Sequence, residues 1–220
     1  MEAIAEASAK VFAELRSDDE EVRAEYFKHF ESEAKVFSDH MAKAVTAWQV
    51  LHSKVGQSER IAFVSAFVYT AITLHIHSMK LLLSGQIIAA GNLFRQGAET
   101  IALSLLCSGK ELNVLNSFID DKYSTSNAIR DVLRHSDKLG LLKEGITTLA
   151  EAQNFYHKFS HPTKLTIAAV TSFSEDGLYI GASFDKEKLG AYSKEVNGRV
   201  SLAKVFYGIV EAVRSNVEKW

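Results

Sequence analysis

Proline is almost absent from this chain: Pro162 is the only one in 220 residues. Because proline breaks helices, its scarcity is typical of a protein built from long helices. Apolar residues also recur at helical spacing, for example Phe30, Phe37 and Met41 between Ser17 and Gly56. The sequence therefore predicts a mainly α protein.

Capping and breaking residues divide the chain into elements. We expect a multi-helix bundle of about four long helices plus shorter ones. The expected order is a short helix over 1–16, a long one from Ser17 to Gly56, two apolar helices on either side of Gly85, shorter pieces over 110–145, a helix over 146–160 that stops at His161-Pro162, and a long final helix capped by Asp185. No linker interrupts it, so residues 1–220 are predicted to form a single helical domain.

One segment departs from the helical pattern. Two runs rich in β-branched and aromatic residues flank Glu175-Asp176-Gly177, and Asp-Gly is a strong hairpin signal. The sequence predicts a β-hairpin at about 164–184, before the C-terminal helix. Because an isolated hairpin is marginally stable, it should pack on the bundle or pair with another chain.

Charge and cysteine usage limit the classes of function. The net charge of −2 gives no basic field, so nucleic acid is not indicated as a partner. Cys107 is the only cysteine, which fits a reducing compartment and a buried, unreactive thiol. The acidic N-terminus does not resemble a signal peptide, so we expect a cytoplasmic protein.

The apolar segment after Ser58 is long enough to raise the possibility of a membrane span. His75, His77 and Lys80 interrupt it, and the next apolar segment carries Arg95 and Glu99. Two central helices of a bundle explain this pattern at a lower cost than charges within a membrane. We therefore expect no membrane as a partner.

Arg95 and Glu99 are the most informative charged pair. They share a helix face at i, i+4, in a segment that is otherwise apolar. Buried charges need partners, so we expect a polar node inside the bundle. The other predicted members are His75 (with His77 as the alternative), Tyr156, Ser160 and His161. Such a node could be a structural ion pair or a binding site.

His157 and His161 are also four residues apart, a spacing that lets two imidazoles share a metal. Pro162 places His161 at a helix end, and a third ligand would have to come from His75 or Glu99. We therefore predict hydrogen bonding by Ser160 and His161, with no metal and no cofactor.

Several of these motifs together resemble a bacterial all-helical family. The resemblance rests on the R-x-x-x-E helix "LFRQGAET", on "FYHKFSHPT", and on "IGASFDKEKLGAYSKE" before a long terminal helix. It covers residues 60–215 and implies a helical bundle with a β-hairpin tail. No activity follows from it, although its general build is similar to that of HEPN (higher eukaryotes and prokaryotes nucleotide-binding) domains.

A second motif, "IRDVLRH", resembles the R-x4-6-H signature of HEPN ribonucleases. By that resemblance, Arg130 would bind a phosphate and His135 would act as the base at a 2′-hydroxyl.

Two classes of function follow. The first is a non-enzymatic helical binding or assembly protein, with an unknown small ligand or protein partner and a possible homodimer formed through the hairpin or the terminal helix. The alternative is a HEPN-like ribonuclease or other hydrolase of defence or toxin type. We favour the first, because the Lys and Arg residues form no basic patch in the sequence.

Overall fold

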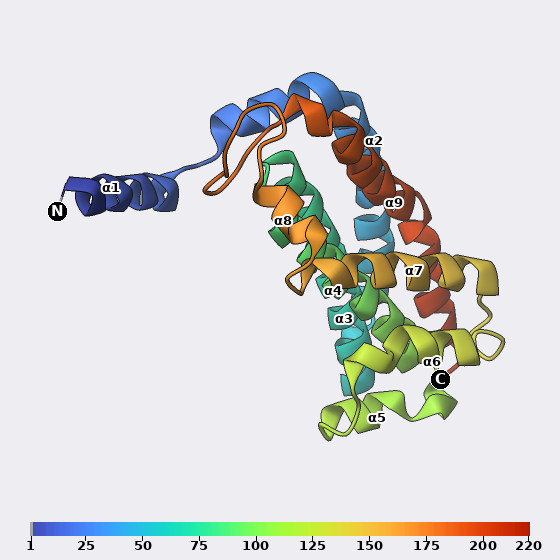
Figure 1. Ribbon diagram of the computed structural model, residues 1–220. Coiled ribbons are helices and arrows are strands. Elements are labelled where there is room, and N and C mark those ends of the chain that lie inside the picture. The colour runs from blue at the N-terminus through green and yellow to red at the C-terminus, as the bar shows by residue number, and fades with distance from the viewer. Residues whose placement is uncertain (1) are drawn as a thin grey trace.

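The computed structural model describes residues 2–220, and within that range the chain is all-helical (Figure 1). The α-helices are α1 (Glu2–Arg16), α2 (Glu20–His52), α3 (Glu59–Leu83), α4 (Ile87–Ser108), α5 (Val114–Ile119), α6 (Ala128–His135), α7 (Lys143–Tyr156), α8 (Lys164–Val170) and α9 (Leu189–Val217). Short 3-10 turns lie at Val55–Gln57, Lys110–Leu112, Thr125–Asn127, His157–Phe159 and Lys186–Lys188. The predicted mainly α class is confirmed.

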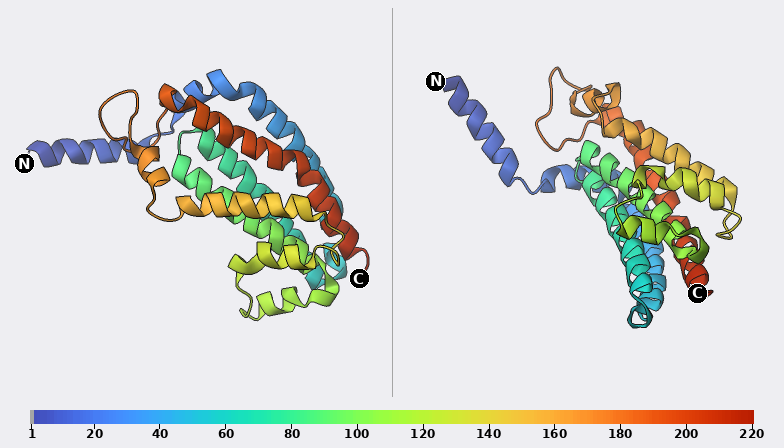
Figure 2. Two further views of the ribbon diagram at one scale, coloured as in Figure 1. Left: turned by 45° about the vertical axis from the view of Figure 1, so that its right-hand side comes forward. Right: turned by 90° about the horizontal axis from the view of Figure 1, so that it is seen from below.

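The four long helices α2, α3, α4 and α9 form the bundle (Figures 1 and 2). α3 and α4 are antiparallel neighbours with the most extensive contact in the fold. Gly85 turns the chain between them with a φ of 78°, a left-handed conformation that suits glycine. A Cβ at this position would lie 2.7 Å from Val22 Cγ1 and 2.8 Å from the Ser183 backbone oxygen. The turn therefore also allows close packing against the start of α2.

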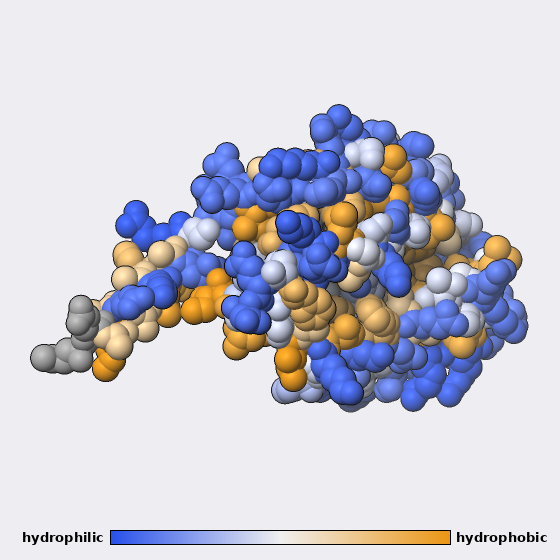
Figure 3. Space-filling model, turned by 45° about the horizontal axis from the view of Figure 1, so that its top comes forward, coloured by the Kyte–Doolittle hydropathy of each residue, from blue (hydrophilic) through white to orange (hydrophobic). Residues whose placement is uncertain are grey.

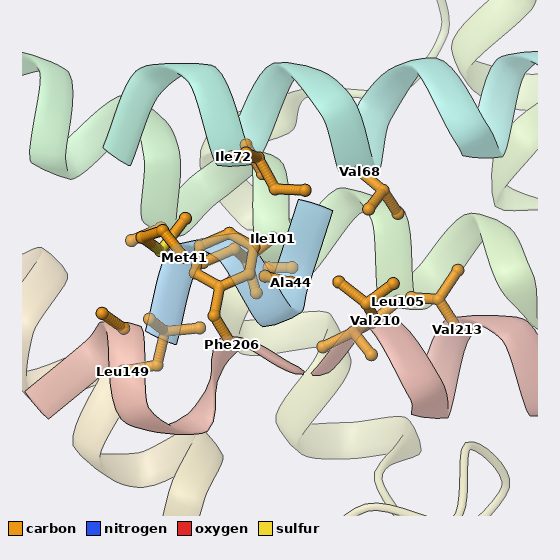
Figure 4. Close-up of a cluster of buried hydrophobic side chains, with 14 of the residues drawn as sticks. Met41, Ala44, Val68, Ile72, Ile101, Leu105, Leu149, Phe206, Val210 and Val213 are labelled. Carbon is orange, nitrogen blue, oxygen red and sulfur yellow. The ribbon is translucent and has the colours of Figure 1, made fainter. Parts of the chain in front are cut away.

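Apolar side chains from all four long helices meet in one core (Figure 4). Helix α7 crosses the bundle and adds Leu149 to this core. The labelled members are Met41 and Ala44 of α2, Val68 and Ile72 of α3, Ile101 and Leu105 of α4, and Phe206, Val210 and Val213 of α9. Burial of this shared apolar surface is the main stabilising contribution to the bundle.

Helix α3 is the segment for which a membrane span had to be weighed. By length and composition alone it is long and apolar enough to cross a membrane, and 44% of its most apolar window is buried inside the protein. The core helix of a soluble protein meets the same criterion. In this fold, Val64, Ile72 and Leu82 of α3 are buried in the bundle core.

Helix α1 extends away from the bundle (Figures 1 and 2). Every side chain from Ala3 to Arg16 is exposed except that of Glu14, which is half-buried beside Gly181. The break after α1 falls at Ser17–Asp19, as expected, and the Ser17 and Asp18 side chains bond to nearby backbone, whereas Asp19, the N-cap of α2, makes no side-chain capping bond. The Ser17 hydroxyl accepts from the Asp19 amide at 3.1 Å, and an Asp18 carboxylate oxygen accepts from the Glu20 amide at 3.0 Å.

The predicted β-hairpin is wrong: residues 2–220 contain no strand, and the first half of the expected hairpin is helix α8. Thr163 explains this difference. Its side chain accepts from the Thr166 amide, and the Thr166 hydroxyl accepts from the Thr163 amide, which completes a capping box. Only an isolated antiparallel bridge between Thr171 and Leu178 remains around the Asp-Gly turn.

Candidate functional site

A fully buried arginine lies at the centre of the most polar region of the core. On α9, the buried positions follow helical spacing through Tyr192, Val196, Val200, Ala203 and Phe206. Arg199 occupies this same buried face, with an exposed fraction of 0%. A buried guanidinium requires charged or polar partners, because desolvation of an isolated cation is very costly.

Three helices supply the direct side-chain partners of Arg199, and a fourth is reached through one of them. Within α9, Nη1 donates to a Glu195 carboxylate oxygen at 2.9 Å. Nε donates to the Ser78 hydroxyl of α3 at 2.9 Å, and Ser78 in turn donates to the Ala90 carbonyl of α4 at 2.8 Å. From α7, the Tyr156 hydroxyl accepts from Nη1 at 3.4 Å and donates to Glu195 at 2.8 Å. Arg199 therefore links α9 to α3, α4 and α7.

His75 completes this cluster from α3. Its Nε2 lies 3.0 Å from the Arg199 carbonyl oxygen, within hydrogen-bonding distance. Burial, together with the charge of Arg199, lowers the pKa of His75 to about 3. The imidazole is therefore neutral near pH 7 and donates to the carbonyl. We call Arg199, Glu195, His75, Tyr156 and Ser78 the polar node.

The polar node is balanced in charge by the Arg199–Glu195 pair and is enclosed by aromatic rings. The Arg199 guanidinium carbon lies 5.3 Å from the ring centre of Phe94 and 5.5 Å from that of Tyr156. Burial raises the pKa of the Tyr156 hydroxyl, so this group stays protonated. Among the described residues, Nη2 of Arg199 is a buried side-chain atom without a hydrogen-bond partner. Such an atom costs stability unless other interactions offset it.

The predicted buried node was centred on the wrong arginine. Arg95 and Glu99 do form an ion pair at 2.9 Å, but 22% of the Arg95 side chain and 16% of the Glu99 side chain are exposed to solvent. Arg95 also donates to the Ser160 hydroxyl at 3.0 Å, and Gln153 donates to Glu99 at 2.9 Å. α7 and the turn after it cover this face of α4 only partly, so the pair lies at the edge of the bundle.

The predicted residues thus separate into two groups and one outlier. Arg95, Glu99 and Ser160 meet at the edge of the bundle, whereas His75 and Tyr156 belong to the polar node. His161 joins neither group: it is exposed, and its ring centre lies 4.4 Å from that of His157. Within residues 2–220, no group of three or more His, Cys, Asp or Glu side chains could hold a metal ion.

Arg199 and Glu195 were not predicted from the sequence, although the apolar pattern of the final helix indicates that position 199 is buried. Position 199 lies three residues after Val196 and four before Ala203, so it falls on the apolar face of the final helix. A charged residue on such a face is a candidate for a buried ion pair. Glu195 stands four residues before it, at the spacing that favours a pair.

Three further residues that the sequence singled out can be placed. Cys107 is buried, and burial raises the pKa of its thiol to about 12, so it has little thiolate character. Arg130 is exposed on the eight-residue helix α6 and contacts Asp131 at 3.3 Å. His135 follows five positions later, which directs it about 140° away around the helix axis.

An apolar groove lies beside the polar node, between α7 and α9, with α4 at its floor. Its volume is about 610 Å³. Its lining is Phe94, Ile101 and Leu105 of α4, residues Gly140–Leu142, Gly145, Ile146, Thr148, Leu149, Ala152 and Tyr156 around α7, and Gly198, Ser201, Leu202, Val205, Gly208, Ile209 and Ala212 of α9. We call this feature the α7/α9 groove. Tyr156 belongs to both features, and Phe94, whose ring packs against Arg199, also lines the groove, so the polar node adjoins one end of it.

Glycines keep the groove open. A Cβ at Gly145 or Gly208 would meet nothing within 4 Å, and one at Gly198 would meet only the Tyr156 hydroxyl, at 3.8 Å. Large apolar side chains at the rim are exposed, with 85% of Leu142 and 56% of Val205 accessible. An apolar channel of this kind is suited to receive apolar side chains or an apolar ligand.

A second cavity, of about 580 Å³, lies near Trp220 and is lined by Lys54, Arg60 and Lys110. Its cations are already engaged. Lys54 pairs with Glu218 at 2.6 Å, Arg60 donates to Asn116 at 3.0 Å, and Lys110 donates to the Trp220 backbone oxygen at 2.9 Å. The α7/α9 groove is therefore the stronger candidate for binding.

The fold and the site define an all-α bundle with a buried Arg199/Glu195/His75 polar node and an adjoining apolar groove. No protein-family model, curated protein or solved structure matches the chain. The family resemblances drawn from the sequence motifs therefore gain no support from these comparisons and stay predictions.

Proposed function

We propose that this protein is a non-enzymatic binding protein whose docking site is the α7/α9 groove. The observation that carries this proposal is the groove itself: about 610 Å³ of apolar space with exposed apolar residues at its rim. Contact with water at such a surface is unfavourable, so covering it with an apolar partner provides the free energy of binding.

The chemistry of the polar node supports binding over catalysis. A general base must be able to reach the proton that it removes. His75 is fully buried, is neutral, and donates to a backbone carbonyl. Glu195 and Tyr156 are engaged with Arg199 and with each other. The node therefore holds α7 and α9 at the spacing that forms the groove.

The ribonuclease alternative is less well supported. It requires Arg130 and His135 to act on the same phosphodiester, but both lie on the short helix α6, and neither lines the α7/α9 groove or the cavity near Trp220. Arg130 is also close to Asp131, which offsets its charge.

Binding of Nile red, a neutral dye that fluoresces in apolar surroundings, tests the proposed function. Gly208→Leu should fill the groove and weaken dye binding by about tenfold or more. Because a Cβ at Gly208 meets open space, and leucine favours helix more than glycine does, the variant should fold.

Gly190→Leu is the matched control. Gly190 lies on the same helix, its Cβ would also meet open space, and it lies outside the groove. This variant should bind the dye like the wild type. Equal binding by both variants, measured at protein concentrations low enough to keep the chain monomeric, would show that the groove is not the docking site.

A further inference from the structure

Helix α1 carries an apolar face that no described part of its own chain covers. Ile4, Val11 and Leu15 fall within about 40° of one another around the helix axis, and 76%, 50% and 78% of these residues are exposed. Phe12 lies beside them with 61% exposed. The charged pair Glu6–Lys10 lies on the opposite side of the helix. In Figure 3, apolar side chains are visible along this projecting segment.

The connection to α2 directs α1 away from the bundle. Only Ser17, Asp18 and Asp19 join the two helices, and the side chains of Ser17 and Asp18 accept from the local backbone. The Asp19 carboxylate also accepts from Gln86 at 3.0 Å, which links this joint to the start of α4. A three-residue connection spans only about 10 Å when fully extended. The α1 of one chain is therefore poorly placed to turn back onto the groove of the same chain.

The groove and the helix match in length and in character. The groove follows α9 from Gly198 to Ala212, which is about 21 Å of helix, and α1 is about 22 Å long. Gly198 and Gly208 leave room for a neighbouring helix to approach closely.

We propose that the α7/α9 groove receives α1 of a second copy of this chain, so that two copies exchange α1 helices in a symmetric dimer. This inference rests on the proposed function, because it names the partner of the same groove. A two-fold dimer satisfies both surfaces at once, since each chain supplies one helix and one groove. Ile4, Val11 and Leu15 insert between α7 and α9, and Glu6 and Lys10 stay in solvent.

The contact area sets the strength of this dimer. A helix about 22 Å long and about 10 Å wide covers roughly 220 Å². In the dimer two helices and two grooves are covered, so the total surface buried is roughly 900 Å², which is below the size of a standard stable interface. The dimer is therefore weak, with a dissociation constant on the order of micromolar or higher.

Sedimentation velocity over a wide concentration range tests the exchange. Wild type should dimerise as concentration rises. Leu15→Asp places a charge on the apolar face of α1 and should weaken dimerisation by about tenfold or more. Gly208→Leu fills the groove and should have the same effect. Ala13→Asp, on the opposite side of α1, and Gly190→Leu, outside the groove, should dimerise like the wild type, and circular dichroism checks that all four variants are folded.

A mixture of the two defective variants identifies the surfaces that meet. Leu15→Asp keeps its groove and Gly208→Leu keeps its α1, so the mixture should regain one of the two contacts and form a heterodimer. Dimerisation that is lost in Leu15→Asp but intact in Gly208→Leu would mean that α1 pairs with α1, and would overturn the proposal. A wild type that is monomeric at all concentrations would also overturn it.

Nile red separates failure of this inference from failure of the proposed function. The Leu15→Asp chain has a free groove and should bind the dye, whereas Leu15→Asp combined with Gly208→Leu should not. If that difference is found but no dimer forms, the groove still binds apolar partners and only the exchange of α1 is wrong. If the difference is absent, both proposals fail.

Discussion

Arg199 illustrates how one residue can organise the interior of a bundle. Its guanidinium is fully buried, yet it reaches an acid, a hydroxyl and a phenol from three helices. A buried ion pair is often no more stabilising than apolar residues of the same volume, but breaking one is costly because a charge is left without its partner. The two members of the Arg199–Glu195 pair should therefore respond differently to substitution.

Removal of Glu195 is expected to cost more than removal of Arg199. Glu195→Ala leaves a fully buried cation uncompensated and should lower the free energy of unfolding by about 3–5 kcal/mol. In Arg199→Met, an apolar side chain replaces the cation, and the remaining Glu195 side chain is 14% exposed to water. The decrease in the free energy of unfolding should therefore be smaller. Urea denaturation of both variants measures the order, and the reverse order would contradict this description of the node.

His75 should make stability depend on pH. Its pKa is about 3 when folded and 6.5 as a model value, so between these values the unfolded chain binds a proton that the folded one does not. The free energy of unfolding should therefore fall as the pH drops below 6.5. Between about pH 7.5 and about pH 5, His75 accounts for a loss of about 2 kcal/mol.

His75→Gln provides the comparison for this pH effect, because glutamine is neutral and can still donate a hydrogen bond. Urea denaturation at the two pH values should show a loss about 2 kcal/mol smaller in His75→Gln than in the wild type. Equal losses in the two proteins would mean that His75 is not the residue responsible.

Among the helices and their connections, the turn between α3 and α4 tolerates a larger residue less well than the turn at Gly140. Gly85→Ala should destabilise the protein by about 1–2 kcal/mol from its left-handed φ alone, and more from the close contacts with Val22 and Ser183. Gly140 also has a positive φ, of 66°, but a Cβ there meets nothing within 4 Å. Thermal unfolding of Gly85→Ala and Gly140→Ala should show the larger decrease in stability for Gly85→Ala.

The elements also show where local sequence signals compete. The β-branched and aromatic run after Pro162 favours strand, but the Thr163–Thr166 capping box forms within a few residues and starts α8 instead. Lys188 then donates to the carbonyls of Ala168 and Thr171 at the end of α8. That contact spans about twenty residues, so no local pattern could have revealed it.

At the scale of the whole molecule, one core joins helices from both halves of the chain. We therefore expect the chain from α2 to α9 to unfold as one cooperative unit, whereas α1 contributes no residue to this core and lies outside that unit. Trp48 donates to the Ser65 backbone oxygen at 3.0 Å, and Trp220 donates to that of Ser108 at 2.8 Å, so the two indoles report on different parts of the bundle. Trp48→Phe and Trp220→Phe should give fluorescence transitions that coincide with circular dichroism, whereas separate midpoints would indicate two domains.

Local sequence patterns are sufficient to predict the all-α class, the four long helices and most of their ends. These features depend on helical periodicity and on caps such as Ser58, whose hydroxyl accepts from the Arg60 amide at 3.2 Å. Such interactions act within a few residues, so the local pattern contains them. It also indicated that polar groups would meet inside the bundle, and it placed His75 and Tyr156 among them.

Which charges are buried and where the groove opens depend on how the helices pack. Arg95 lies at a bundle edge because α7 and its following turn cover α4 incompletely, while Arg199 lies where α3, α4, α7 and α9 converge. The groove lies between α7 and α9 above α4, beside the polar node, and Gly198 and Gly208 leave that space unfilled. Helix packing joins residues more than a hundred positions apart, and that information is not contained in the periodicity of any single helix.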